Sequence, residues 1–333
     1  MLPVYVPHYY PAFRCIASAC RHTCCVGWEI DVDETALVRF DALSRRGGPF
    51  ADRLKAAIDR EADPPCFILD EQERCPFLNA NGLCDLITAY GEAALCQICT
   101  DHPRFRRVLP DRVELGLGLC CEAAAELILS QEQPMTIIQL PPADAAREPN
   151  ADASLEELDP VTETLLRARE AILTVLTDRD RPLSDRIRHV LTALDIHLPV
   201  RAYADWAEFL SDMERLDPAW DDCLEALATL GDGGDCMQAH EWDNDASAPC
   251  EHLLTYFLYR YLANQDERVA FGLSPTTLIR TRTAFAVLAT VLIRAVAQTS
   301  NLPLAEAARL FSSEIEYSEE NLERLMDYLE ENV

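Results

Sequence analysis

The chain has 333 residues, of which 49% are hydrophobic and 26% are charged, and this is typical of a globular protein with a large core. Its net charge of −28 argues against binding to nucleic acid or to anionic membranes, because both are negatively charged. Such a surface would attract a basic protein segment, although solvation alone also explains it.

The first part of the chain predicts short elements. Residues 1–14 are expected to be extended, with their aromatic side chains packed onto the domain, and residues 28–32 alternate as in a short strand. Helices are predicted over 34–46, with Asp33 as N-cap, and over 50–61, 84–90 and 120–130. Two hairpins are expected, one pairing 66–69 with 75–78 and one pairing 104–108 with 112–117.

The second part of the chain predicts helices almost throughout. Residues 131–157 are rich in proline and small residues, and we interpret them as a linker. Helices are expected over 158–177, 183–196, 203–215, 219–230, 250–263, 275–298, 302–313 and 318–331. In the loop 231–244 and just beyond it, Asp243 and Asp245 are spaced as in some calcium sites, but an ordinary solvated loop is the better interpretation.

The predicted fold class is therefore mainly α. A Cys-rich metal-binding domain with short β-hairpins is expected over 1–130, the linker over 131–157, and an acidic all-α domain over 158–333. Residues 1–10 lack the basic and apolar regions of a signal peptide. The apolar run 283–297 is shorter than a membrane span. A cytoplasmic location without membrane insertion follows as an expectation.

Cysteines carry the most specific signal, because eleven of the fourteen lie between Cys15 and Cys121. In a reducing compartment such a group indicates metal or redox chemistry more than disulfides. An Fe–S cluster or a tetrahedral zinc ion needs about four sulfurs, and we expect four to converge on one point. Either two sites exist, or some thiols only pack in the core. Cys223, Cys236 and Cys250 are interpreted as packing residues.

Other motifs give weaker signals. The spacing of Cys20, Cys24 and Cys25 differs from that of radical-SAM enzymes, because Gly27 stands at the third position. The run 113–118 is similar to a methyltransferase glycine loop, but no parallel-sheet pattern follows it. His102 is a candidate ligand or base, and a hydrogen-bonded histidine explains it equally well. His22 is a weaker candidate of the same kind.

Several stretches together resemble the flagellin lysine-N-methylases, the FliB family. The resemblance is strong before residue 130 and weak after it. It lies in Cys15, Cys20-x3-Cys24-Cys25-x-Gly27-Trp28, Cys75-Pro-Phe-Leu78, Leu83-Cys84, Cys99-x2-His102-Pro-Arg104, Cys120-x-Glu122 and the segment 251–260. The N-terminal part is also similar to zinc- and iron-chelating domains of the YkgJ type.

This resemblance implies a 4Fe-4S protein that transfers methyl groups from S-adenosylmethionine to lysines of flagellin or another lysine-bearing protein. The cysteines that match the family are Cys15, Cys20, Cys24, Cys25, Cys75, Cys84, Cys99 and Cys120. Cys66 is additional, His102 stands where the family usually has Tyr, and Cys121 where it often has Pro. No residue can be matched to a catalytic role or to S-adenosylmethionine binding. The alternatives are a non-catalytic zinc- or iron-chelating module and an interaction protein with structural zinc.

Overall fold

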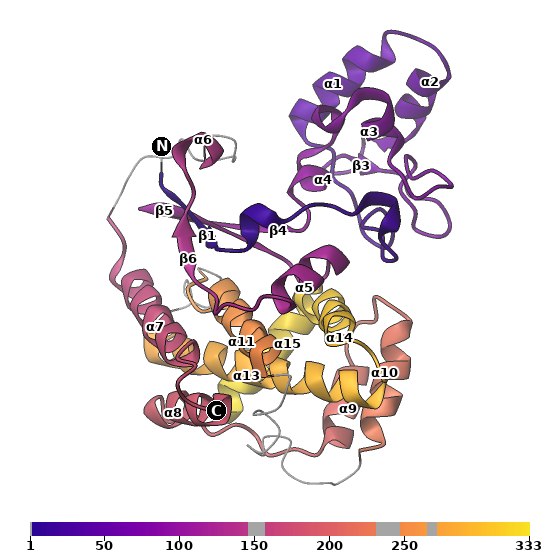
Figure 1. The fold of residues 1–333 in the computed structure, drawn as a ribbon. Coiled ribbons are helices and arrows are strands. Elements are labelled where there is room, and N and C mark those ends of the chain that lie inside the picture. The colour runs from indigo at the N-terminus through magenta and orange to yellow at the C-terminus, as the bar shows by residue number, and fades with distance from the viewer. Residues whose placement is uncertain (1, 146–156, 231–246, 265–271) are drawn as a thin grey trace. The chain divides into compact units, whose positions relative to one another are not determined.

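The computed structural model describes residues 2–145, 157–230, 247–264 and 272–333, and in these ranges the chain is mainly helical with two small sheets (Figure 1). The described residues form two compact units. The cysteine unit comprises Arg14–Phe105 with Cys121–Ala123. The helical unit comprises the residues before Arg14, Arg106–Cys120 and the chain from Ala124 onward.

This division differs from the expected boundary at residue 130, and a four-stranded sheet is the reason. Strand β1 (Val4–Pro7) pairs in parallel with β5 (Arg112–Leu117) and antiparallel with β6 (Ile137–Gln139). Strand β4 (Arg104–Leu109) lies at the edge, beside β5 as expected for a hairpin. Because β1 and β5 are buried in this sheet, the N-terminal residues belong to the helical unit and not to the cysteine unit. The expected linker thus contains β6 and α6 (Pro142–Ala145), and residues 146–156 lie outside the described ranges.

The helical unit contains long helices at the positions that the sequence predicts. Their bounds are α5 (Glu122–Leu129, whose first two residues belong to the cysteine unit), α7 (Pro160–Leu176), α8 (Leu183–Ala193), α9 (Tyr203–Ser211), α10 (Ala219–Ala228), α11 (Ser247–Tyr261), α13 (Pro275–Thr299), α14 (Leu304–Phe311) and α15 (Glu319–Asn332). A π-helical turn, Ser312–Glu316, follows α14. The loop 231–244, with Asp243 and Asp245, lies outside the described residues.

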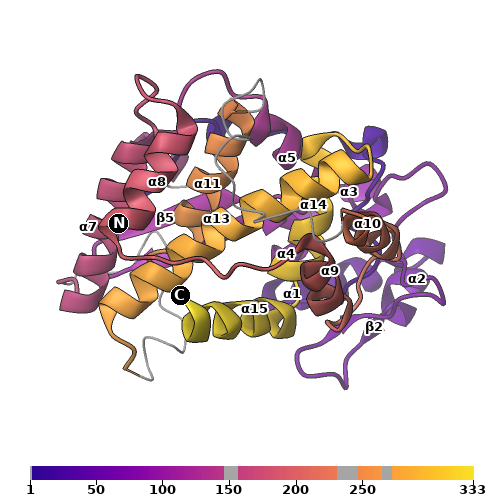
Figure 2. The ribbon, with the colours of Figure 1, turned by 90° about the horizontal axis from the view of Figure 1, so that it is seen from below.

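Helix α13 is the centre of the helical unit and contacts α7, α10, α11, α14 and α15 (Figure 2). By length and composition it could cross a membrane, which the shorter apolar run in the sequence did not indicate. However, 78% of its most apolar window is buried inside the protein. This burial is typical of the core helix of a folded domain.

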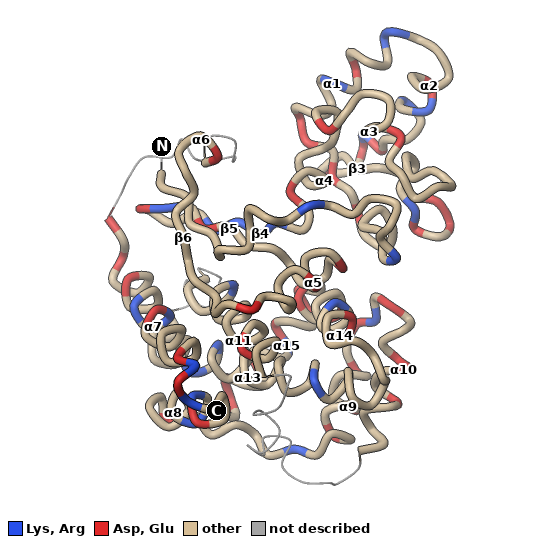
Figure 3. Tube along the Cα trace, in the orientation of Figure 1, with Lys and Arg blue, Asp and Glu red and all other residues tan. Residues whose placement is uncertain are grey.

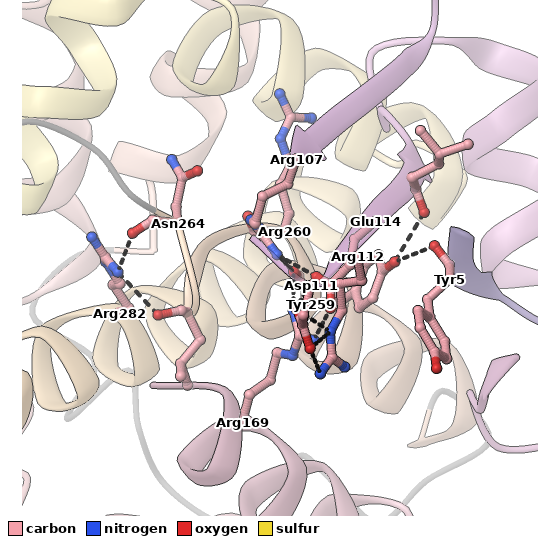
Figure 4. Close-up of polar contacts among 12 residues, drawn as sticks. Tyr5, Arg107, Asp111, Arg112, Glu114, Arg169, Tyr259, Arg260, Asn264 and Arg282 are labelled. Carbon is pink, nitrogen blue, oxygen red and sulfur yellow. Dashed lines mark hydrogen bonds and ion pairs between the residues drawn. The ribbon is translucent and has the colours of Figure 1, made fainter. Parts of the chain in front are cut away.

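Helix α11 is buried along almost its whole length, and arginine side chains donate hydrogen bonds to the carbonyl groups at its C-terminal end (Figure 4). Arg107 and Arg169 both donate to the carbonyl of Tyr259 and both form ion pairs with Glu114 on β5, at 2.7 and 2.5 Å. Arg282 donates to two further carbonyls, those of Leu262 and Asn264. Unpaired carbonyl groups at a helix end attract cations. Arg107 and Arg169 thus join the helix to the sheet through Glu114, and Arg282 joins the end of the helix to α13.

The cysteine unit consists of short elements around an aromatic core. Its helices and strands are α1 (Glu34–Ser44), α2 (Pro49–Ala56), β2 (Ile58–Asp59), β3 (Cys66–Phe67), α3 (Asp85–Tyr90) and α4 (Gln97–Asp101). Phe40 and Phe77 are fully buried and both contact Phe67. Asp33 caps α1, as predicted, by accepting from the backbone N–H of Ala36 at 2.9 Å.

Two predictions for this unit are wrong. The segments 66–69 and 75–78 do not pair as a hairpin, because β3 pairs instead with β2, and Arg74 forms a bridge with Val26. Residues 28–32 form no strand, and Asp31 makes only an isolated bridge with Cys66. Strand β3 thus pairs with the preceding segment instead of the following one, and Asp31 and Arg74 have bridge partners that are distant in the sequence.

Candidate functional site

Ten of the eleven clustered cysteines lie in the cysteine unit, and the exception is Cys120. None of the thirteen cysteines in the described ranges forms a disulfide bond. Nine of those in the cysteine unit form two sets of thiols that act electrostatically on one another, and the contact between Cys24 and Cys25 joins the sets. The outer set is Cys15, Cys20, Cys24 and Cys121. The inner set is Cys25, Cys75, Cys84, Cys96 and Cys99.

The outer set is organised by Glu122 at the start of α5. Its carboxylate accepts hydrogen bonds at 2.8 Å from both the backbone N–H and the Nε–H of Arg21, and the Cys20 thiol lies 3.7 Å from it. Partial burial raises the pKa of Glu122, but the hydrogen bonds from Arg21 outweigh this and lower it overall. This carboxylate therefore holds Cys121 beside the loop that carries the other outer thiols.

Main-chain hydrogen bonds draw the inner set together, and one of them joins segments that are distant in the sequence. The N–H of Cys75 donates to the carbonyl of Cys25 at 2.7 Å, and Leu78 bridges to Cys84. Cys84 is the residue before α3, and Cys96 is the residue before α4. The fold thus presents inner thiols from a loop, from two helix starts and from within α4.

Thiols of the inner set disfavour one another's ionisation. Burial raises the pKa of Cys75 to about 12, and its neighbours Cys25, Cys99 and Cys84 contribute to this increase. The pKa of Cys99 is raised by its hydrogen bond with Cys96 and by burial. Burial and then Cys25 and Cys99 raise the pKa of Cys84. A bound cation would reverse this effect, because a metal centre deprotonates the thiols that ligate it.

Cys25 is the exception among the inner thiols. Its hydrogen bond with Cys24 lowers its pKa to about 7 against the effect of burial, with help from the Thr23 hydroxyl and the charge of Arg74. Cys24 belongs to the outer set, so two adjacent residues contribute one thiol to each set.

The expected convergence of four sulfurs on one point is not present in the described residues as a preformed ion site. No group of three or more His, Cys, Asp or Glu side chains in these ranges is arranged to hold a metal ion. The neighbouring thiols nevertheless provide the chemistry that an Fe–S cluster requires. A cluster also spaces its ligands more widely than one ion does, because iron and sulfide atoms lie between the cysteine sulfurs.

Two aromatic side chains lie beside the outer set. The indole N–H of Trp28 donates to the carbonyl of Cys24 at 2.6 Å, and its ring contacts His102 with centroids 5.6 Å apart. Burial lowers the pKa of His102 to about 4, and Arg104 contributes to this. The imidazole is therefore neutral at physiological pH, whichever of its candidate roles it has.

Not every matched cysteine joins a set. Cys120 lies in the helical unit, where it hydrogen-bonds Tyr317. Cys66, which is additional to the family pattern, is buried in β3, and burial and then Glu29 raise its pKa. Cys223 and Cys250 are buried in the helical unit, as expected of packing residues, and Cys236 lies outside the described residues.

The list of matched cysteines omitted Cys96 and Cys121, which the structure brings into the sets. Two sequence signals could have identified them. Cys96 and Cys99 stand three residues apart, which brings them together in the first turn of α4. Cys121 immediately precedes Glu122, the residue that binds the outer loop.

Lysine-N-methylases of Salmonella are similar to part of this chain. That of Salmonella choleraesuis (strain SC-B67) is 26% identical over 148 residues, which is 40% of this chain and 33% of the relative. That of Salmonella typhimurium (strain LT2) is 25% identical over 144 residues, 39% of this chain and 33% of the relative. The flagellar biosynthetic protein FliU of Salmonella muenchen is 26% identical over 148 residues and is covered to 79%. The match thus spans about a third of the length of the lysine-N-methylases. No family profile and no solved structure matches the chain.

Proposed function

Because this chain resembles the flagellin lysine-N-methylases, we propose that it transfers methyl groups from S-adenosylmethionine to lysine side chains of a protein. Flagellin is the proposed substrate, since one similar protein is named as flagellar. The observation that carries the proposal is this similarity, and the two thiol sets agree with the cysteine pattern on which it rests.

We assign a 4Fe-4S cluster to four thiols of the inner set, Cys25, Cys75, Cys84 and Cys99. They come from separate segments, and each is at least partly shielded from water. Burial and neighbouring thiols raise the pKa of Cys75, Cys84 and Cys99, so these thiols stay protonated without a cation, whereas the pKa of Cys25 is lowered to about 7. When bound, the cluster would supply positive charge beside these thiols. The outer set is a candidate second metal site.

Methyl transfer places a simple demand on the protein. The substrate lysine is an ammonium ion in water and has no lone pair, so it must lose a proton before it attacks the methyl carbon. The nitrogen–carbon bond then forms while the carbon–sulfur bond breaks, and the electron pair leaves with sulfur. The acidic surface would concentrate a lysine-bearing substrate near the protein.

The proposal predicts an iron-dependent colour and a methyl-transfer activity. Purified protein should be brown, with broad absorbance near roughly 400 nm, and should transfer label from S-adenosylmethionine to flagellin. Cys75→Ala and Cys99→Ala should lose iron, sulfide and transfer together, whereas Cys223→Ala, which alters a buried thiol of the helical unit, should keep all three. Lys55 is the only lysine of the chain, so a Lys55→Arg variant removes labelling of the protein itself.

A non-catalytic chelating module is the second candidate, and the presence of two thiol sets favours it. The same preparation separates the two functions. Brown protein that carries intact cluster and yet labels no lysine of flagellin would support chelation and contradict the enzyme. Colourless protein with stoichiometric zinc would contradict the cluster.

A further inference from the structure

Three aromatic rings in the helical unit surround one arginine, and we call them the aromatic cage. They are Trp206 and Phe209 of α9 and Tyr328 of α15. Each ring centroid lies within 5.8 Å of the next, and the rings of Trp206 and Tyr328 meet at 81°. The guanidinium of Arg201 lies 5.0, 5.3 and 5.2 Å from the three centroids. These distances are those of cation–π contacts.

In the described residues, the guanidinium of Arg201 is held by its contacts with these three rings. Within the residues that the structure describes, its guanidinium makes no hydrogen bond or ion pair. Arg324 provides a comparison, because it also stacks on Phe209 but donates a hydrogen bond of 2.7 Å to the carbonyl of Asp212. Arg201 is partly exposed and belongs to the irregular segment that joins α8 to α9. It is therefore an occupant that another cation can displace.

The cage has further features of a binding site. Trp206 is fully buried, and its indole N–H has no acceptor within the described residues. Such an unpaired donor is costly, and the carbonyl of a bound peptide could satisfy it. Phe209 and Tyr328 are only partly buried, so the cage can be reached from the surface. Exposed carboxylates stand next to its rings in the sequence, at Asp205, Glu208 and Asp327.

We propose that the aromatic cage binds the methylated lysine side chain of a partner protein and that Arg201 occupies the cage when this ligand is absent. Aromatic faces favour cations that are weakly hydrated, such as guanidinium and methylated ammonium, over the strongly hydrated ammonium of lysine. The identity of the ligand rests on the proposed function, since methylated lysine would be the product. A cage of this kind would retain a methylated substrate while its other lysines react.

The test measures binding directly, without S-adenosylmethionine. A pentapeptide with a central trimethyllysine is titrated into the full chain by calorimetry, and peptides with lysine or norleucine at that position serve as controls. Arg201→Ala removes the internal competitor and should bind the trimethyllysine peptide about ten-fold more tightly than wild type. Adding Tyr328→Leu, which keeps most of the buried volume, should abolish this gain. Arg188→Ala, an exposed arginine of α8, is the matched control and should leave the affinity at the wild-type value.

Two outcomes would contradict the proposal that the cage binds methylated lysine. One is Arg201→Ala protein that is folded and yet binds no trimethyllysine peptide. The other is equal affinity for the trimethyllysine, lysine and norleucine peptides. Failure of the proposed function is distinct, because a protein without methyl transfer can still bind a synthetic methylated peptide, and an active enzyme can lack this binding.

Discussion

At the scale of single residues, Glu114 shows how a buried charge is stabilised in this protein. Its side chain is 1% exposed and lies between the guanidinium groups of Arg107 and Arg169. Burial raises the pKa of Glu114, but Arg169 and Arg107 outweigh burial and lower it to about 2. The second positive charge is offset by the carbonyl groups at the end of α11. Removing either sign of charge would leave the other unpaired in the core.

Glu114→Gln should therefore destabilise the helical unit by about 3–5 kcal/mol, because two buried guanidinium groups lose their counter-charge. Urea unfolding followed by circular dichroism measures the change. Glu163→Gln is the matched control, since Glu163 forms an exposed ion pair with Arg167, and it should change the free energy of unfolding by less than about 1 kcal/mol. Equal effects of the two substitutions would contradict the assigned role of the buried pair.

The same carboxylate predicts a dependence of stability on pH. Its folded pKa lies below its ordinary value of 4.5, so its contribution is complete above that value and is lost as the pH falls toward about 2. Wild type should lose more stability than Glu114→Gln between pH 5 and about 2.5. Parallel pH profiles of the two proteins would show that Glu114 titrates normally.

At the scale of elements, Asp33 links two helices of the cysteine unit. One carboxylate oxygen caps α1 at Ala36, and the other accepts from the N–H of Gln97, the first residue of α4, at 2.7 Å. A single side chain thus satisfies an unpaired donor at the start of both helices. Because α4 carries Cys99, this contact also holds one inner thiol in position.

Asp33→Ala should lower the free energy of unfolding by about 2 kcal/mol, since two helix starts lose their acceptor. Thermal unfolding of the purified protein would detect it. Asp52→Ala is the comparison, because Asp52 lies in the first turn of α2 without a capping role, and it should have an effect within about 0.5 kcal/mol. A smaller loss for Asp33→Ala than for Asp52→Ala would contradict the double cap.

The elements also show what could be predicted from the sequence. Helices α7 to α15 in the described ranges were predictable because a helix carries its pattern of apolar residues along its own length. The hairpin expected at 66–78 was wrong because β3 selects a partner near residue 58. The grouping of the thiols could not be predicted either, because a main-chain hydrogen bond brings Cys25 and Cys75 together from segments fifty residues apart. Cysteine spacing identified the region and the candidate ligands, but not the division into two sets.

At the scale of the whole molecule, negative charge is the main surface property. Acidic positions occur along the helices of the helical unit, including α10 (Figure 3). Of the net charge of −28, −21 lies after Gln133. A charge of this size acts over about 10 Å at ordinary ionic strength and is screened at higher salt.

Association with the proposed substrate, flagellin or another lysine-bearing protein, should therefore slow as salt is added. We expect the association rate constant to fall by about ten-fold between 50 and 500 mM NaCl, while the dissociation rate changes less. Stopped-flow fluorescence measures both rates, and a neutral peptide of the same length is the control. An association rate that does not change with salt would show that the acidic surface does not contribute to substrate binding.

The order of the chain has one further consequence. Strand β1 ends before the cysteine unit begins, and its parallel partner β5 starts after most of that unit is complete. The 104 residues from 8 to 111 therefore separate the two strands, and closing a disordered loop of that length costs conformational entropy. Any process that makes the intervening segment compact should therefore speed the pairing of β1 with β5. If the cysteine unit binds the cluster proposed above, iron supplied during synthesis would assist formation of the distant sheet, and cells starved of iron would accumulate less of the folded polypeptide.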